Sequence, residues 1–175
     1  MASVKYTDLE TDEETSFYME PTLLANLEQI KTKLTRDEDY VLAIDGREGS
    51  GKSVFGMQVA KAIDPTLSLD RICMNAQQFK DAIYKAQKGQ AIIFDEAFSG
   101  LSSRGSMSEI NRMLVSLMMQ MRQKNLFVVV ILPTFFMLDR YVAIFRSRGL
   151  IHIHKVKDKR YFMVFNHKKK EKAIS

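Results

Sequence analysis

Residues 46–53 read GREGSGKS and match the Walker A pattern G-x-x-x-x-G-K-S at every fixed position. Phosphate oxygens need several N–H donors directed at one small volume, and glycines allow the backbone to wrap that closely. In this pattern Lys52 supplies a positive charge to the β- and γ-phosphates, and the Ser53 hydroxyl supplies a ligand to Mg²⁺. We call residues 46–53 the glycine loop. The residues expected to bind ATP are Gly46, Glu48, Gly49, Ser50, Gly51, Lys52, Ser53 and Val54.

Two carboxylates, Asp95 and Glu96, follow the apolar residues 91–94. Parallel strands end on a common carboxyl edge where ligands bind, so this Walker B-like pair is expected near the glycine loop. Asp95 would hold Mg²⁺ directly or through water, and Glu96 would polarise the attacking water as the catalytic base. An isolated Asp-Glu pair is more often a solvated turn. Its place behind an apolar run and downstream of the glycine loop favours the functional interpretation.

Both motifs need elements that position them, and the hydrophobic pattern predicts these elements. Short apolar runs predict strands at residues 40–44, 69–74, 91–94 and 126–132. Three- and four-residue spacing predicts helices at residues 20–34, 53–63, 76–87, 108–124 and 139–146. The alternation of strands and helices is typical of a three-layer α/β domain with a mostly parallel central sheet.

The two ends of the chain differ in pattern from this centre. Residues 150–155 and 161–166 predict a C-terminal antiparallel β-hairpin at about 150–167, followed by a basic tail at 168–175. Residues 1–19 are polar, acidic and without periodicity, so we expect a flexible acidic arm there. The remaining residues, 20–175, are expected to form a single domain.

The glycine loop together with Asp95 and Glu96 resembles the RecA-like P-loop NTPases of the additional-strand, catalytic-glutamate class. The resemblance implies a further strand between the strand before the glycine loop and the strand before Asp95, and residues 126–132 are the candidate. The tip of that strand, Pro133 and Thr134, would then lie between the two motifs. In that position Thr134 is expected to be the γ-phosphate sensor.

Within this class, the order of elements from residue 40 to residue 167 is similar to that of the FtsK/HerA-type DNA-pumping ATPases. Viral genome-packaging ATPases and zonula occludens toxin-like proteins are neighbouring groups. Three features carry the likeness. The first is Asp-Glu-Ala at 95–97, followed by a long helix that ends in Arg-Gln-Lys-Asn at 122–125. The others are a strand that runs into Leu-Pro-Thr at 132–134 and the terminal hairpin. Many relatives carry glutamine after the sensor threonine, whereas Phe135 stands here.

This resemblance implies ATP hydrolysis coupled to the translocation or packaging of double-stranded DNA by a ring of subunits, expected to be a hexamer. Such motors complete the site with an arginine from a neighbouring subunit, which neutralises charge on the transferred phosphoryl group. Arg146 and Arg148 are the first candidates for this arginine finger. Further candidates are Arg104, Arg112 and Arg122, and Arg104 is also a weaker candidate for DNA contact. For any single arginine, a surface or ion-pairing role is the commoner alternative.

Methionines and histidines also suggest chemistry, but a plainer account is available for each. Four methionines of the fourth helix, Met113, Met118, Met119 and Met121, are expected to fill a core. His152 and His154 alternate on one strand and should share a face, which could suggest a metal site with His167. Because no third ligand has convincing spacing, we expect ordinary edge-strand histidines.

Composition and charge restrict the class of protein. The 175 residues are 46% hydrophobic and 27% charged, as in one globular domain, and the single Cys73 excludes an internal disulfide. Residues 1–20 have no apolar signal segment, and the longest apolar run, 126–138, is too short to span a bilayer. We therefore expect a cytoplasmic protein, which would lie in the host cytoplasm if it is viral. The net charge of +5 divides unevenly: six acids against one lysine in 1–20, and eight bases against two acids in 155–175.

Two other functions remain open on these residues. A small-molecule P-loop kinase would need an arginine-rich lid, and the one lid candidate, residues 99–106, contains a single arginine. An assembly or export protein that uses nucleotide as a switch would resemble the zonula occludens toxin-like group, which commonly carries a membrane span. The basic C-terminal end fits contact with nucleic acid and a solvated lysine-rich tail equally well.

Overall fold

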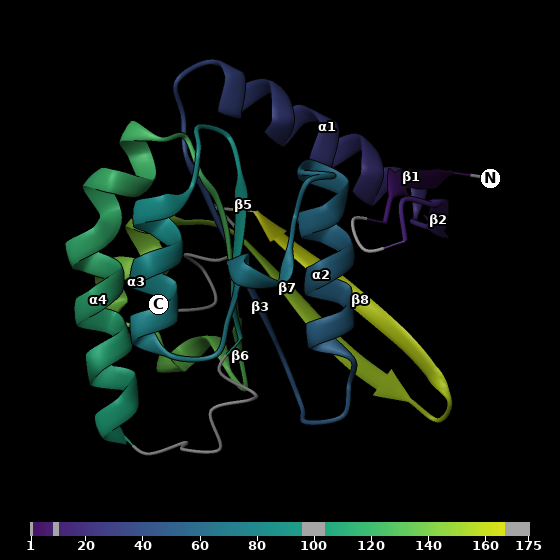
Figure 1. Ribbon diagram of the computed structural model, residues 1–175. Helices are drawn as coiled ribbons and strands as arrows, with labels where there is room; N and C mark the ends of the chain where they lie inside the picture. Colours follow the sequence, from purple (N-terminus) through teal and green to yellow (C-terminus); the bar gives the residue numbers. More distant parts are fainter. Residues whose placement is uncertain (1, 9–10, 96–103, 167–175) are drawn as a thin grey trace.

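The computed structural model describes residues 2–8, 11–95 and 104–166, and its centre is a six-stranded sheet of order β4-β5-β6-β3-β7-β8 (Figure 1). The strands are β3 (Tyr40–Gly46), β4 (Ile72–Cys73), β5 (Ala91–Asp95), β6 (Phe127–Leu132), β7 (Ser147–Val156) and β8 (Lys159–Asn166). Neighbours from β4 to β7 run parallel, and β8 returns antiparallel to β7. The predicted mostly parallel sheet with a C-terminal antiparallel hairpin is therefore confirmed.

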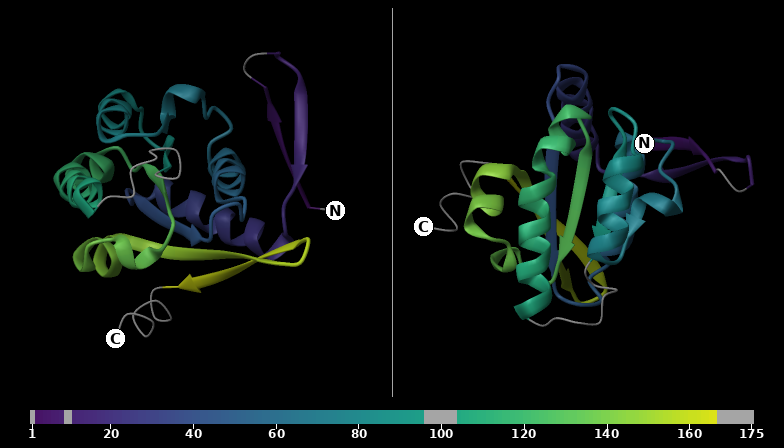
Figure 2. Two further views of the ribbon diagram at one scale, coloured as in Figure 1. Left: turned by 90° about the horizontal axis from the view of Figure 1, so that it is seen from below. Right: turned by 60° about the vertical axis from the view of Figure 1, so that its left-hand side comes forward.

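Helices cover both faces of this sheet and give the predicted three layers (Figures 1 and 2). Helices α1 (Pro21–Thr35) and α2 (Lys52–Ile63) lie on one face, and α3 (Ala76–Lys85) and α4 (Arg104–Gln123) lie on the other. The strand β6 shows why its sequence is apolar throughout. Its residues alternate between the two cores, with Phe127, Val129 and Ile131 on the α2 side and Val128, Val130 and Leu132 on the α4 side. The arrangement is consistent with a RecA-like three-layer fold.

The position of β6 is the feature of the sheet that matters most for the site. Phe127 of β6 is in register with Tyr40 of β3 on one side and with Ala91 of β5 on the other. The predicted additional strand between the glycine-loop strand and the Asp95 strand is therefore present. Because β3, β5 and β6 run parallel, their carboxyl ends lie together at the lower edge of the sheet in Figure 1.

Two predicted elements differ from those observed. In place of a strand over residues 69–74, the chain forms a 3₁₀ turn at Leu69–Arg71 and a two-residue β4. The turn directs Arg71 inward, where it forms a buried ion pair with Asp64. The predicted short helix around 139–146 is present at residues 140–146, but its last five residues, Val142–Arg146, form a π-helical turn; a 3₁₀ turn at Phe135–Met137 precedes it.

The N-terminal segment also differs from the irregular arm that was expected. Strands β1 (Ser3–Thr7) and β2 (Glu14–Tyr18) pair antiparallel and form a separate two-stranded hairpin that projects from the body (Figure 2). Val4 and Met19 are buried in the core on the α1 and α2 side. Val4 and Tyr6 alternate with polar residues, which is the period-two pattern of a half-buried strand, and the sequence prediction missed it.

A buried polar cluster fixes the start of β5 to the end of α2. Asp64, just past α2, accepts a hydrogen bond of 2.9 Å from the N–H of Ala91 and one of 2.9 Å from the N–H of Thr66. Burial alone would raise the pKa of the Asp64 carboxyl, but the hydrogen bonds from Thr66, Ala91 and Arg71 outweigh it and lower that pKa. Asp64 is therefore an ionised, fully bonded link between the glycine-loop helix and the Asp95 strand.

Within the described part of the chain, the helices are all too short or too polar to cross a lipid bilayer.

Candidate phosphate-binding site

The glycine loop connects β3 to α2 and depends on glycine at two positions. Gly46 has φ +146°, and a Cβ there would lie 2.2 Å from the carbonyl oxygen of Ile153 in β7. Gly51 has φ +89° and is the N-cap of α2, with no side chain among the described residues capping the helix. The loop therefore packs tightly on β7 and leaves the first N–H groups of α2 available, which is the arrangement that binds anions.

Lys52 lies inside the glycine loop. Its Nζ donates hydrogen bonds of 2.7 Å to the Gly46 carbonyl and 3.0 Å to the Arg47 carbonyl, and only 5% of the residue is exposed. Burial lowers the pKa of Lys52, whereas the negative charges of Asp95, Glu48 and Asp45 act in the opposite direction. The ammonium group is thus held at the centre of the loop, where the sequence pattern predicts it.

Asp95 and Ser53 are brought to this same edge of the sheet. Asp95 is the last residue of β5, is buried, and lies in register with Ile131 of β6. Ser53 lies in the first turn of α2 and is half-buried. Glu96, the predicted catalytic base, lies outside the described residues.

The donor set fits a magnesium ion that is held partly by phosphate. Among the described residues there is no cluster of three or more His, Cys, Asp or Glu side chains that could cage a metal alone. A hydroxyl from Ser53 and a carboxylate from Asp95 are the hard oxygen ligands that Mg²⁺ prefers, and Mg²⁺ usually completes its shell with water and substrate phosphates. The residues therefore suit Mg²⁺ that arrives with a nucleotide.

Asp45 was missed by the sequence reasoning, and it links the end of β3 to the segment after β6 and to the middle of β7. Its Oδ2 accepts a 2.9 Å hydrogen bond from the N–H of Phe135, and its Oδ1 lies 2.8 Å from Nδ1 of His152 in β7. A single acid directly before the glycine loop, at the end of an apolar strand, was the signal that could have found it. Through Phe135, Asp45 holds the half-buried Thr134 beside the end of β3, between the two motifs as predicted.

The two arginine-finger candidates lie elsewhere in this chain. Arg146 donates a 2.6 Å hydrogen bond to Asp39, and Arg148 forms an ion pair with Glu38. Glu38 and Asp39 precede β3, so both pairs lie at the amino edge of the sheet, opposite the glycine loop. The ion-pairing interpretation is confirmed for both residues. A finger role would require the loop of another subunit and stays a prediction.

The histidine and methionine predictions are confirmed in part. The prediction of edge-strand histidines is wrong, because β7 lies between β3 and β8. The rings of His152 and His154 stack with centroids 6.0 Å apart, so the two residues share a face as expected. Met121 is buried, and Met113 and Met118 pack against the core on the α4 side. The core prediction is wrong for Met119, which is 74% exposed because it lies on the outer side of α4.

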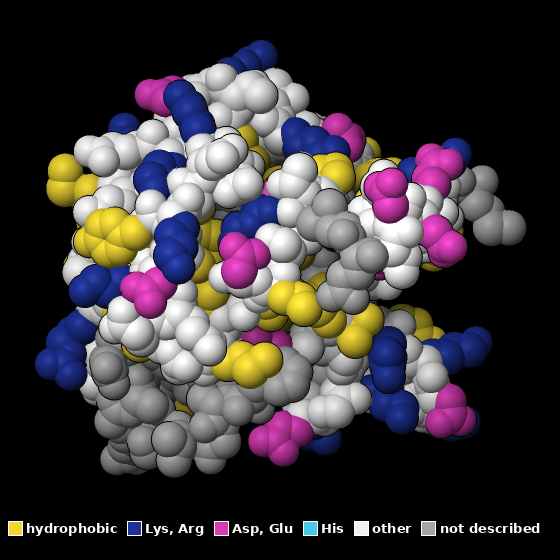
Figure 3. Space-filling model, in the orientation of Figure 1, with side chains coloured by type: hydrophobic (Ala, Val, Ile, Leu, Met, Phe, Trp, Pro, Cys, Tyr) yellow, Lys and Arg dark blue, Asp and Glu magenta, His cyan; other side chains and the backbone are white. Residues whose placement is uncertain are grey.

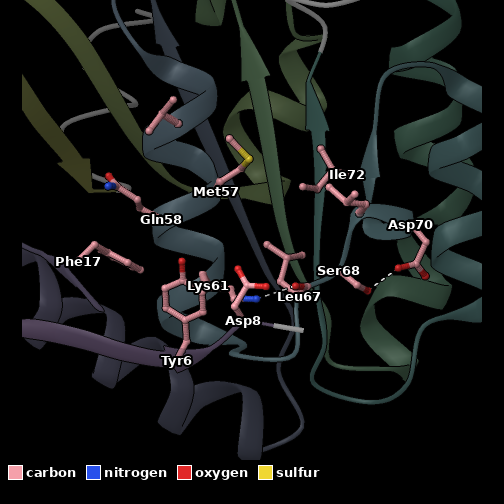
Figure 4. Close-up of a pocket in the computed structure, with 12 residues that line it drawn as sticks. Tyr6, Asp8, Phe17, Met57, Gln58, Lys61, Leu67, Ser68, Asp70 and Ile72 are labelled. Carbon is pink, nitrogen blue, oxygen red and sulfur yellow. Dashed lines mark hydrogen bonds between the residues drawn. The ribbon is translucent and has the colours of Figure 1, made fainter. Parts of the chain in front are cut away.

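A second hollow lies on the outer side of α2, under the N-terminal hairpin (Figure 4). It has a volume of about 640 Å³ and is lined mainly by apolar side chains, among them Phe17, Met57 and Ile72. Lys61 crosses it, donating a 2.9 Å hydrogen bond to the Leu67 carbonyl and lying 4.8 Å from the centre of the Tyr6 ring. No residue of the glycine loop lines this hollow, but Val54, which follows the loop and is among the residues expected to bind ATP, does.

No protein-family model matches the sequence, and no curated protein matches it significantly. The functional argument therefore rests on the residues and on their arrangement in this fold. The arrangement joins Lys52, Ser53, Asp95 and Thr134 at one edge of the sheet and leaves Arg146 and Arg148 at the other.

Proposed function

We propose that this protein is a Mg²⁺-dependent ATPase whose phosphate site is the glycine loop. The observation that carries the proposal is the buried Lys52, bonded to the Gly46 and Arg47 carbonyls at the uncapped start of α2, with the charge of Asp95 acting on it. Free N–H groups, a held ammonium group and a nearby carboxylate are what a triphosphate with its metal ion requires.

Each residue has a role in this proposal. Lys52 and the first N–H groups of α2 bind the β- and γ-phosphates, and Ser53 and Asp95 hold Mg²⁺, which neutralises charge on the phosphates. Glu96, next to Asp95, accepts the proton of the attacking water. Thr134 orients that water or a γ-phosphate oxygen, with Asp45 as the residue that positions it.

We further propose that hydrolysis is coupled to movement of double-stranded DNA, by a ring in which Arg146 or Arg148 of one subunit reaches the glycine loop of the next. Four basic side chains of the β7–β8 hairpin support a surface for a polyanion: Lys155, Lys157, Lys159 and Arg160 are all exposed. Figure 3 shows Lys and Arg side chains gathered at the tip of this hairpin, at the lower right. Phosphate backbones bind such surfaces through their charge.

The test is phosphate release from MgATP by the purified chain, with and without double-stranded DNA. We expect turnover that rises with DNA, no turnover for Lys52→Ala, and bound but uncleaved ATP for Glu96→Gln. Affinity for DNA should fall as salt rises, because phosphate contacts release counterions. Glu96→Gln that hydrolyses ATP at the wild-type rate would remove the catalytic-base assignment.

The coupling to DNA is tested separately from hydrolysis. Native mass spectrometry with ATP and DNA present should give a closed ring, and a monomer under those conditions would contradict the motor. ATP-dependent appearance of a phosphorylated small molecule would favour a kinase. Tight nucleotide binding with neither turnover nor DNA affinity would favour a nucleotide-switched assembly protein.

A further inference from the structure

The C-terminal hairpin lies directly against the glycine loop. The guanidinium group of Arg160, the second residue of β8, is the nearest group to Gly51: a Cβ built on Gly51 would lie 3.0 Å from its Nη1 and 3.2 Å from its Cζ. The β7 strand, which carries β8, is in register with β3 up to Gly46 and Ile153. The approach of Arg160 to the loop is therefore set by the sheet.

Arg160, which is exposed, lacks the carboxylate partner that Arg71, Arg146 and Arg148 have within the described residues. Within residues 2–8, 11–95 and 104–166, no carboxylate lies within ion-pair distance of Arg160. A guanidinium placed beside the positive N-terminal end of a helix favours a bound group that is electron-rich.

A second polar group beside Arg160 also lacks a partner. The Ser50 hydroxyl is buried, with 3% of the residue exposed, and makes no hydrogen bond to the described residues. Buried hydroxyls in native proteins are nearly always bonded, so an unbonded one at a cavity indicates a ligand that completes it. Ser50 and Arg160 line the same cavity.

This cavity has a volume of about 220 Å³ and lies between the start of α2 and the start of β8. Gly51, Val54 and Gln58 line it on one side, Arg160 lines it on the other, and the rings of Phe55 and Phe162, with centroids 5.4 Å apart, also contribute. Pockets that hold whole drug-sized ligands have volumes of about 300–1,000 Å³, so this smaller cavity suits one part of a nucleotide. It adjoins the larger hollow of Figure 4, because Val54 and Gln58 line both.

We propose that this cavity binds the nucleoside of the nucleotide, an inference that rests on the proposed ATP site. With the triphosphate wrapped by the glycine loop, the α-phosphate lies at the first turn of α2, and the nucleoside continues past Val54 into the cavity. The planar guanidinium of Arg160 stacks on the base, whose π-face attracts a cation. The amide of Gln58, one helical turn beyond Val54, offers both a donor and an acceptor to the edge of the base.

The test separates recognition of the nucleoside from recognition of phosphate. Calorimetric affinities are measured for MgATP and for magnesium tripolyphosphate, which carries the phosphates without a nucleoside. Wild type should bind MgATP more tightly. Arg160→Ala should weaken MgATP binding about tenfold and leave tripolyphosphate binding within about twofold, as expected for loss of a cation–π contact. Arg160→Lys keeps the charge but loses the planar stack, so it should weaken MgATP almost as much.

Matched controls make the result specific to the cavity. Lys80→Ala removes an exposed charge from α3, on the other face of the sheet, and should change neither affinity. Gln58→Ala should weaken MgATP only, whereas Met57→Ala, which alters the Figure 4 hollow alone, should not. Thermal unfolding of each variant checks that the fold is retained.

Three outcomes would overturn the inference. Equal losses for MgATP and tripolyphosphate in Arg160→Ala would place Arg160 on the phosphates. Unchanged MgATP affinity in Arg160→Ala and Arg160→Lys would leave the cavity without a role in binding. Loss of MgATP affinity in Met57→Ala, with none in Arg160→Ala, would place the nucleoside in the Figure 4 hollow. Failure of wild type to bind either ligand would instead refute the ATP site itself.

Discussion

The carboxylate of Asp45 accepts a hydrogen bond of 2.9 Å from the backbone N–H of Phe135, although 90 residues separate them. Asp45 is buried and is the residue before the glycine loop, and Phe135 is the residue after Thr134. The Asp45 carboxylate that accepts from the Phe135 N–H also contacts the ring of His152. The proposed sensor is thus anchored to the start of the proposed phosphate site.

Replacing Asp45 should therefore impair turnover more than nucleotide binding. Asp45→Ala removes the acceptor for Phe135, and we expect kcat to fall by up to about 100-fold because a displaced catalytic group costs that much. MgATP affinity should change little, since the glycine loop itself is intact. Steady-state kinetics and calorimetry check this expectation.

A double-mutant cycle separates this role from general damage. If Asp45 acts by positioning Thr134, Asp45→Ala and Thr134→Ala should each reduce kcat, and the double variant should be little worse than either single one. Fully additive losses would contradict the positioning role.

Lys52→Ala should lower ATP turnover by at least about 100-fold, because it removes a charge aimed at the phosphates. The variant also loses two hydrogen bonds to the loop carbonyls, so its affinity for MgATP should fall as well. Lys61→Ala, near the other end of α2, is the matched control and should retain both turnover and affinity. Equal turnover in Lys52→Ala and wild type would contradict the proposed site.

Asp64→Ala should destabilise the fold by about 3–5 kcal/mol, because it leaves the buried Arg71 without its partner. Urea unfolding at pH 7 measures this loss. Folding lowers the pKa of Asp64 from its ordinary value of 3.8. The ionised carboxylate therefore adds to the free energy of unfolding above pH 3.8, and this addition disappears as pH falls through the lower folded-state pKa. The stability difference between wild type and Asp64→Asn should accordingly narrow below pH 3.8; a difference that is unchanged there would contradict this account.

Cys73 should be unreactive in the folded protein. Burial raises the pKa of its thiol to about 12, and the nearby charges of Asp70 and Asp81 act in the same direction. Because the thiolate is the reactive form, a disulfide reagent at pH 8 should modify the chain only after unfolding in urea. Rapid labelling under native conditions would show that β4 opens locally.

The sequence predicted best those elements that are buried on both faces. The runs at 40–44, 91–94 and 126–132 are apolar at every position, and each appears as a central strand. Their order in the sheet came from the resemblance of the two motifs to a known class. Periodicity by itself would not have placed β6 between β3 and β5.

The remaining features depend on contacts that local pattern does not encode. The hairpin of β1 and β2 buries few side chains, so its sequence reads as polar. The pairing of Asp45 with Phe135 and the approach of Arg160 to Gly51 join residues about 90 and 109 positions apart. The first contact follows from the register of β6 beside β3, and the second from the register of β7 beside β3.

The close packing of Gly46 on Ile153 has a mechanical consequence. Six ladder partners join β3 to β7, and at the last of them the carbonyl of Ile153 fills the space where a side chain on residue 46 would be. The glycine loop and the ten-residue strand β7, which leads to the hairpin tip, are thus packed together as one unit. A rotation of this unit about Gly46 would therefore displace the basic tip of the hairpin farther than the loop, because the tip lies farther from Gly46 along β7.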